Sequence, residues 1–213
     1  MKNKVISYTL GEELFSSISH GVGAIFGVCA LVLMVIKSAI AGSALKVVCS
    51  AIFGASIIIL YTMSTLYHAI TNKTAKAVFR ILDHTTIFIL IAGTYTPICL
   101  VTLGGWLGWT IFGVQWGVAA LGITLNAVSI ERFKVFSMIG YITLGWCVIF
   151  AARPMIQHMA PVGLLLMLIG GIFYTAGITF YALKKIKYMH SIWHLFVLAG
   201  TVFHTFAISL YIL

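Results

Sequence analysis

Long apolar segments follow one another along nearly the whole chain, and they constrain its fold more than any other feature. They cover approximately residues 18–37, 45–69, 83–102, 107–128, 135–152, 161–183 and 190–213. A helix of about 20 apolar residues crosses the hydrocarbon core of a bilayer. With 62% hydrophobic and 8% charged residues, a soluble domain of this length would expose too much apolar surface. The sequence therefore predicts a single all-α domain, residues 1–213, with seven transmembrane helices.

Positive charges between these segments predict the orientation. With the N-terminus in the cytoplasm, the outer loops hold Lys37, Lys46 and Arg153. The inner segments then hold the ten other basic residues, namely Lys2, Lys4, Lys73, Lys76, Arg80, Arg132, Lys134, Lys184, Lys185 and Lys187. The positive-inside rule favours this orientation, with the C-terminus outside. The net charge of +9 is spread over short clusters between apolar runs, so it indicates contact with lipid headgroups and not a nucleic-acid partner.

Four ionisable residues, His68, Asp83, His190 and His194, fall at the predicted cytoplasmic ends of three different spans. His190 and His194 are four residues apart, so both rings leave the same face of a helix. Asp83 is the only aspartate in the chain. Ionisable groups inside a membrane are costly and mark functional sites. Three imidazoles and a carboxylate at similar depth predict a Zn²⁺ site with a reactive water.

Other interpretations of these residues stay open. The histidines of the last span could be interfacial side chains that reach toward headgroups. Asp83 could form a surface ion pair with Arg80, three residues earlier, or it could be a direct fourth ligand. Beside zinc it could instead hold the bound water and accept its proton. The four cysteines are isolated within apolar segments, which predicts small core residues without disulfides or metal.

Further polar residues are candidates for the second shell or for a cavity. Ser64 lies one turn before His68, where its hydroxyl could orient water or substrate, or simply bond its own backbone. Glu13 and His20 are two helical turns apart and could pair at the mouth of a cavity. His84 is predicted to point about 100° away from Asp83. Glu131 is interpreted as an ordinary loop charge.

Two more candidates lie deeper in the predicted spans. Thr94 lies three turns from Asp83 on a similar face and could bond backbone groups that a kink at Pro97 releases. His204 lies about 15 Å deeper than His194 along the last span. It is too far to share the metal, but it could line a polar cavity, or it could be a core histidine with its hydrogen bonds satisfied, which is the favoured interpretation.

Three blocks of the sequence are similar to the haemolysin III family, the bacterial branch of the progestin and adipoQ receptors. They are Glu12 to Gly21 (EELFSSISHG), Ser64 to His68 (STLYH) with Asp83-His84 and Gly93 to Pro97 (GTYTP), and His190 to His194 (HSIWH). The resemblance covers nearly the whole chain. Ser16 departs from the family's pattern, where asparagine is expected, which puts a polar role at this position in doubt.

This resemblance implies a seven-helix protein of the bacterial cell (inner) membrane with an intramembrane zinc on the cytoplasmic side. By matching motifs it makes His68, His190 and His194 the metal ligands. It gives Asp83 the role of holding a zinc-bound water, with Ser64 nearby. The related adiponectin receptors and alkaline ceramidases imply hydrolysis of a ceramide-like lipid amide.

The sequence leaves three functions open. The first is a zinc-dependent hydrolase of lipid amides, or a regulator of membrane lipid or energy homeostasis, with membrane lipids and a lipid-like substrate or ligand as partners. The second is a non-enzymatic receptor or sensor with a structural zinc. The third, suggested by the haemolysin label, is a pore-forming protein, which ranks last because spans four to six carry few polar residues. The oligomeric state is left open as well.

Overall fold

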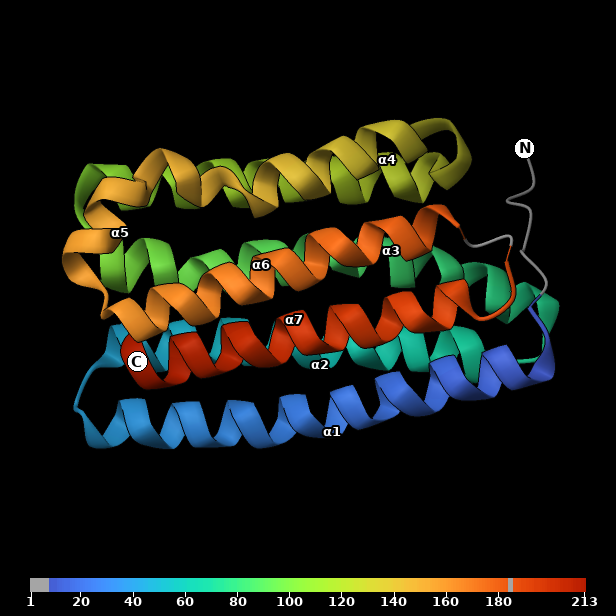
Figure 1. Ribbon diagram of the computed structural model, residues 1–213, viewed down its shortest axis with the longest axis horizontal. Helices are drawn as coiled ribbons and strands as arrows, with labels where there is room; N and C mark the ends of the chain where they lie inside the picture. The colour runs from blue at the N-terminus through green and yellow to red at the C-terminus, as the bar shows by residue number, and fades with distance from the viewer. Residues whose placement is uncertain (1–7, 184–185) are drawn as a thin grey trace.

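The structure is a computed structural model that describes residues 8–183 and 186–213, and within these ranges it contains helices and no strands (Figure 1). The helices are α1 (Leu10–Ile40), α2 (Ala44–Ala69), α3 (Lys73–Pro97), η1 (Ile98–Leu103), α4 (Gly105–Gly145), η2 (Cys147–Ala151), α5 (Ala152–His158), α6 (Pro161–Ala182) and α7 (Met189–Tyr211). The all-helical architecture predicted from the sequence is confirmed.

Several helices extend beyond the apolar runs because polar side chains cap them. Thr9 and Glu12 form a reciprocal capping box, so α1 begins at Leu10 instead of near residue 18. The Asn72 side chain accepts hydrogen bonds from two backbone amides, and α3 begins at Lys73, ten residues before the predicted boundary. At its other end α3 reaches Pro97 and continues as the π-helix η1. Capped, polar turns therefore lengthen α1 and α3 beyond the apolar segments that predicted them.

Six helical stretches of the described residues are long and apolar enough to cross a membrane, against the seven predicted. The difference lies in Gly105–His158, which is counted as one stretch of 54 residues. The backbone of Ser129 is extended (φ −166°, ψ 108°), and α4 bends back there. Asn126 Oδ1 accepts a hydrogen bond from Ser137 Oγ at 2.7 Å, and Gln115 Nε2 donates to the Leu144 carbonyl at 3.0 Å. The two arms of α4 therefore pack against each other.

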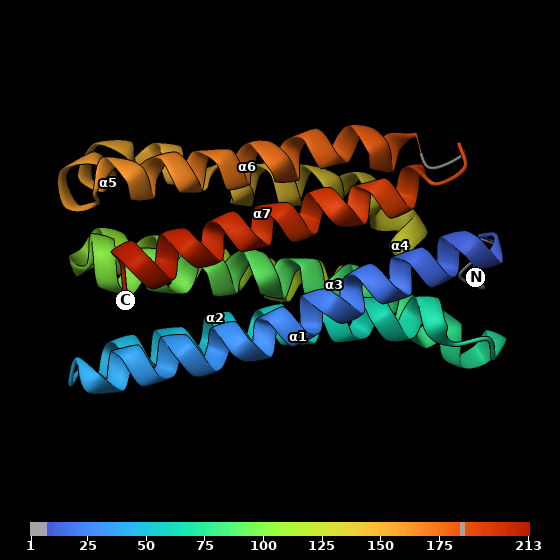
Figure 2. The ribbon, with the colours of Figure 1, turned by 60° about the horizontal axis from the view of Figure 1, so that its bottom comes forward.

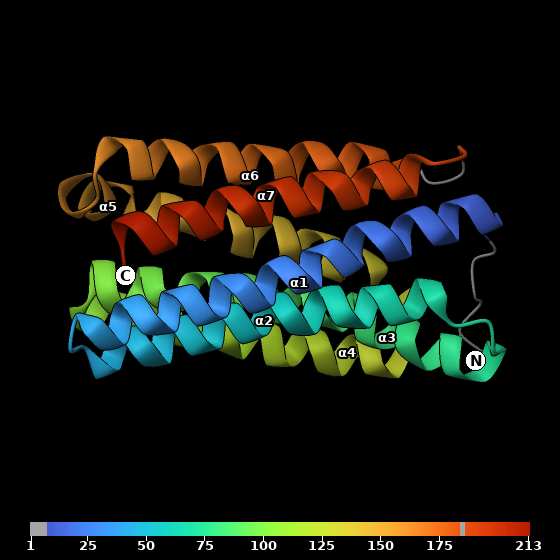
Figure 3. The same ribbon diagram turned by 90° about the horizontal axis from the view of Figure 1, so that it is seen from below.

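The helices lie roughly antiparallel in an elongated bundle. α1 packs on α2 and α7, α2 on α3, α3 on α4, and α6 on α7 (Figures 2 and 3). Figure 1 shows that α1, α3 and α7 begin at one end of the bundle, where α2 and α6 end and α4 bends. We call this the histidine end, because it holds His68, Asp83, His190 and His194. The bundle thus brings together residues that are more than 100 positions apart in sequence.

Candidate metal centre

Three buried histidines converge where α2 and α7 meet. One ring nitrogen of each of His68, His190 and His194 lies within 4.8 Å of the others, and all three side chains are at most 3% exposed. The Nε2 atoms of His190 and His194 are 3.2 Å apart. Two ligands of a tetrahedral zinc, each about 2.0–2.1 Å from the ion, would be about 3.3 Å apart. The cluster can therefore hold a metal ion, and the distance between these two nitrogens matches that between two ligands of zinc.

Glu13 fixes the orientation and proton position of His68. Its Oε2 lies 2.6 Å from His68 Nδ1, and its Oε1 pairs with Lys76 Nζ at 2.8 Å. A proton on Nδ1, donated to the carboxylate, leaves Nε2 with a free lone pair. Nε2 is buried and has no hydrogen-bond partner in the described part of the chain. This carboxylate–histidine arrangement is the usual support of a metal ligand.

We expect Glu13→Gln to weaken zinc binding by about 10–100-fold, because a neutral amide no longer raises the basicity of His68. Zinc affinity would be measured by competition with a chromophoric chelator. Glu12→Gln is the matched control, since it makes the same exchange at the neighbouring residue, whose two oxygens accept from the Thr9 and Tyr188 backbone amides and not from His68. Equal zinc affinities for the two variants would contradict the role assigned to Glu13.

Asp83 lies beside this cluster and outside it. It is buried, yet it is absent from the group of nitrogens and oxygens that lie within 4.8 Å of one another. The Ser64 hydroxyl is buried next to the Asp83 carboxylate without forming a hydrogen bond of normal geometry. His84 was predicted to point away from Asp83, but its Nδ1 lies 3.6 Å from Asp83 Oδ2. The carboxylate therefore lies close to Ser64 and His84 and is near enough to His68 to feel its charge, but it is outside the group of converging nitrogens.

The predicted pair of Glu13 and His20 is not formed. The His20 ring instead stacks on His194, with centroids 3.7 Å apart, and meets the edge of Tyr61 at 4.8 Å. Tyr61 and Tyr174 each place their hydroxyl within hydrogen-bond distance of Thr201 Oγ1, at 2.7 and 2.8 Å. His20 therefore supports His194 by ring stacking, and Tyr61 packs against His20 while its hydroxyl bonds deeper in the bundle.

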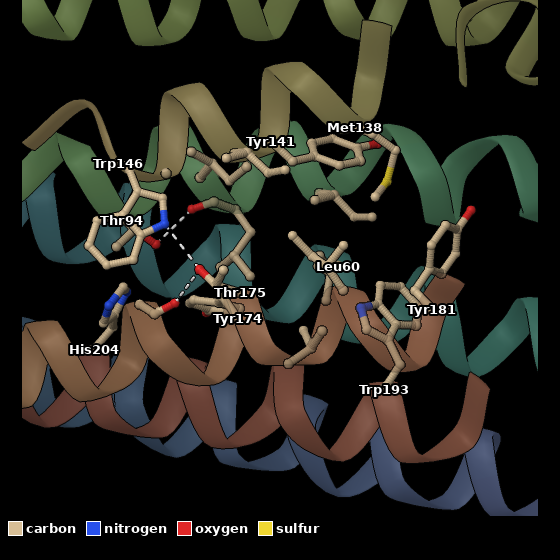
Figure 4. A pocket seen from close by; sticks show the side chains of 18 of the residues that line it. Leu60, Thr94, Met138, Tyr141, Trp146, Tyr174, Thr175, Tyr181, Trp193 and His204 are labelled. Atoms are coloured by element: carbon tan, nitrogen blue, oxygen red, sulfur yellow. Dashed lines mark hydrogen bonds between the residues drawn. The ribbon is translucent and has the colours of Figure 1, made fainter. Parts of the chain in front are cut away.

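An elongated cavity of about 150 Å³ extends from Asp83 and His20 along the bundle between α3, α4, α6 and α7. Figure 4 shows Tyr141, Met138, Tyr181 and Trp193 toward the histidine end, and Trp146, Thr94, Thr175 and His204 toward the other. Most of the lining is apolar, as an acyl chain requires. His204 is among the residues that line this largely apolar cavity, and its Nε2 bonds the Met167 carbonyl at 3.0 Å. Thr94 also lines it and bonds the Leu90 carbonyl at 2.7 Å.

Sequence reasoning missed several contacts around the site. Tyr8 stacks on His190 with ring centroids 4.7 Å apart, and nothing in its local sequence indicated this contact. The Ser16 and Ser191 hydroxyls are 3.0 Å apart, so Ser16 does have a polar role, which the sequence had put in doubt. Its signal was the position one turn before His20.

Arg80 and Glu131 also differ from their predicted roles. Arg80 does not pair with Asp83, because its Nη2 donates to Glu131 Oε1 at 2.6 Å. Glu131 is thus a partner of a buried arginine on another helix, and not an ordinary loop charge. This leaves the Asp83 carboxylate available to the metal centre.

Comparison with known proteins gives one consistent result. A profile of the family described as "Haemolysin-III related" matches residues 8–205. "Hemolysin-3 homolog" of Bacillus subtilis (strain 168) is 41% identical over 174 residues, which is 82% of each chain. "Hemolysin-3" of Bacillus cereus is 41% identical over 170 residues, 80% of this chain and 78% of its own. The human "Monocyte to macrophage differentiation factor" is 28% identical over 140 residues, 61% of this chain and 56% of its own. No solved structure matches.

Proposed function

Because the chain belongs to the haemolysin III-related family and is a multi-pass bacterial membrane protein, we propose that it is a zinc-dependent hydrolase of a ceramide-like lipid amide. One observation carries this proposal. Three buried histidines with ligand spacing lie beside Asp83, a carboxylate outside their cluster that lines the end of an apolar cavity. A purely structural zinc would be expected to have four protein ligands.

We propose further that the chain crosses the membrane seven times, with the two arms of α4 as separate spans. The bend at Ser129 and the packing of the arms on each other support this count. The histidine end would face the cytoplasm. The described basic residues support that orientation, because Lys73, Lys76 and Arg80 lie in the first turns of α3, whereas Lys37 and Arg153 belong to the other end.

His68, His190 and His194 would hold the zinc, and bound zinc would polarise the substrate carbonyl and activate water. The chain's own residues would do the rest. Asp83 would hold the attacking water and accept its proton, then deliver a proton to the leaving amine. Ser64, beside Asp83, would orient that water. The cavity would bind the acyl chain and exclude bulk water from the reacting bond.

The test is hydrolysis of a fluorogenic N-acyl lipid by purified protein in lipid nanodiscs. We expect fatty acid release that a chelator abolishes and added zinc restores. A catalytically silent protein that still contains one zinc would overturn the enzyme proposal and favour a zinc-containing receptor. Release of a dye trapped in liposomes, independent of zinc, would favour a pore.

A further inference from the structure

Arg80 is a buried cation whose hydrogen-bond donors are only partly satisfied. Its side chain is 3% exposed and lies on α3, one turn before Asp83. Nη2 donates to Glu131 Oε1, whereas Nε and Nη1 have no hydrogen-bond partner in the described part of the chain. A guanidinium has five N–H donors and no acceptor, and buried donors without partners are costly. Acceptor oxygens are therefore needed beside Arg80.

Asn126 presents a second unsatisfied donor to the same place. Its side chain is 1% exposed, and its Oδ1 accepts the hydrogen bond from Ser137 Oγ. The amino group takes no part in that bond, and Nδ2 is buried with no hydrogen-bond partner among the residues that the structure describes. Arg80, Asn126 and the exposed Lys134 line one pocket. With Glu131 as the one acidic residue lining it, the pocket keeps a net positive charge.

The size of this pocket limits what can enter it. Its volume is about 20 Å³, whereas a water-sized group needs about 10–15 Å³. One or two oxygen atoms fit, and the rest of a ligand must lie outside. Four residues line both this pocket and the long cavity, so the two adjoin; they are His84, Met138, Tyr141 and Tyr181. A lipid whose chain lies in the cavity would bring its headgroup to Arg80.

We propose that the pocket of Arg80 and Asn126 binds a phosphate group. The hydrogen-bond donors come from two helices, and Lys134 adds a positive charge at the rim. An anionic oxygen forms stronger hydrogen bonds with a guanidinium than a neutral oxygen does, and a cationic group would be repelled. The phosphate comes either from an anionic phospholipid beside the cavity or from free inorganic phosphate. The site lies at the headgroup level of the histidine end, where basic residues attract anionic lipid. It does not depend on hydrolysis of any substrate.

The experiment measures binding to full-length, delipidated protein by native mass spectrometry. One arm titrates phosphatidylglycerol against phosphatidylcholine, and the other titrates inorganic phosphate alone. The variants are Arg80→Gln and the isosteric Asn126→Asp, which places a negative charge in the pocket. Arg153→Gln, an exposed arginine on α5, is the matched control.

We expect phosphatidylglycerol to bind at least about tenfold more tightly than phosphatidylcholine, and both pocket variants to lose that preference while Arg153→Gln keeps it. Inorganic phosphate that binds and is lost in the same variants, without a lipid preference, would support the site and identify free phosphate as its source. If Arg80→Gln fails to fold, Asn126→Asp decides. Unchanged phosphatidylglycerol and phosphate binding in the folded pocket variants overturns the proposal.

Discussion

His194→Ala is expected to leave the purified protein with almost no bound zinc. His194 is fully buried, and its Nε2 faces that of His190 at 3.2 Å, so the variant removes one of three converging ligands. Loss of a residue that only supports a ligand weakens metal binding by about 10–100-fold, and loss of the ligand itself should exceed that. Zinc per chain would be measured by mass spectrometry of the elements after purification in zinc-containing buffer.

The control for this measurement is His158→Ala. His158 is an exposed histidine on α5, at the other end of the bundle, and its ring bonds only the Pro154 carbonyl among the contacts of the described residues. His194→Cys offers a thiolate in place of the imidazole and should retain more zinc than His194→Ala. That result would show that the alanine variant loses zinc because it lacks a ligand and not because it is misfolded. If His194→Ala, with an unchanged melting temperature, kept as much zinc as His158→Ala, the cluster would not be the metal centre.

The gathering of the histidines at one end of the bundle could be predicted from the sequence, because the order and direction of the spans determine it. Apolar segments and basic loops assign His68 and His190 to one end of the bundle without any knowledge of side-chain contacts. The structure then brings these residues within 4.8 Å of each other and of His194. The α2 boundary was also predictable, since its apolar run of residues 45–69 coincides with the helix Ala44–Ala69.

Side-chain partners between helices could not be predicted in this way. Glu13 contacts His68 instead of His20, and Arg80 contacts Glu131 instead of Asp83, because helix rotation and packing decide such pairs and sequence spacing does not. The position of the bend in α4 was predictable, since the apolar segments 107–128 and 135–152 are separated there, but its geometry at Ser129 was not. No proline or glycine marks it, and the extended backbone of a single serine divides α4 into two packed arms.

Asp83→Asn is expected to abolish amide hydrolysis while zinc content stays near that of the wild-type protein. The amide has nearly the same shape as the carboxylate but cannot accept a proton from water. A general base contributes about 10²–10⁴-fold to a rate, so turnover should fall by at least that range. Zinc should remain, because the Asp83 oxygens lie outside the group of histidine nitrogens that can ligate it. Turnover in nanodiscs and zinc per chain would be measured on the same preparation.

Thr85→Val is the matched control for Asp83→Asn. Thr85 is a buried residue of α3, two positions from Asp83, and its hydroxyl bonds only the Leu82 carbonyl among the contacts of the described residues. The exchange is nearly isosteric, and Thr85 does not line the cavity, so turnover should be unchanged. Loss of zinc together with turnover in Asp83→Asn would make the aspartate a fourth ligand. Full turnover in that variant would remove Asp83 from the reaction. Another carboxylate of the chain is not expected to replace it, because Glu12, Glu13 and Glu131 are already bound to other partners.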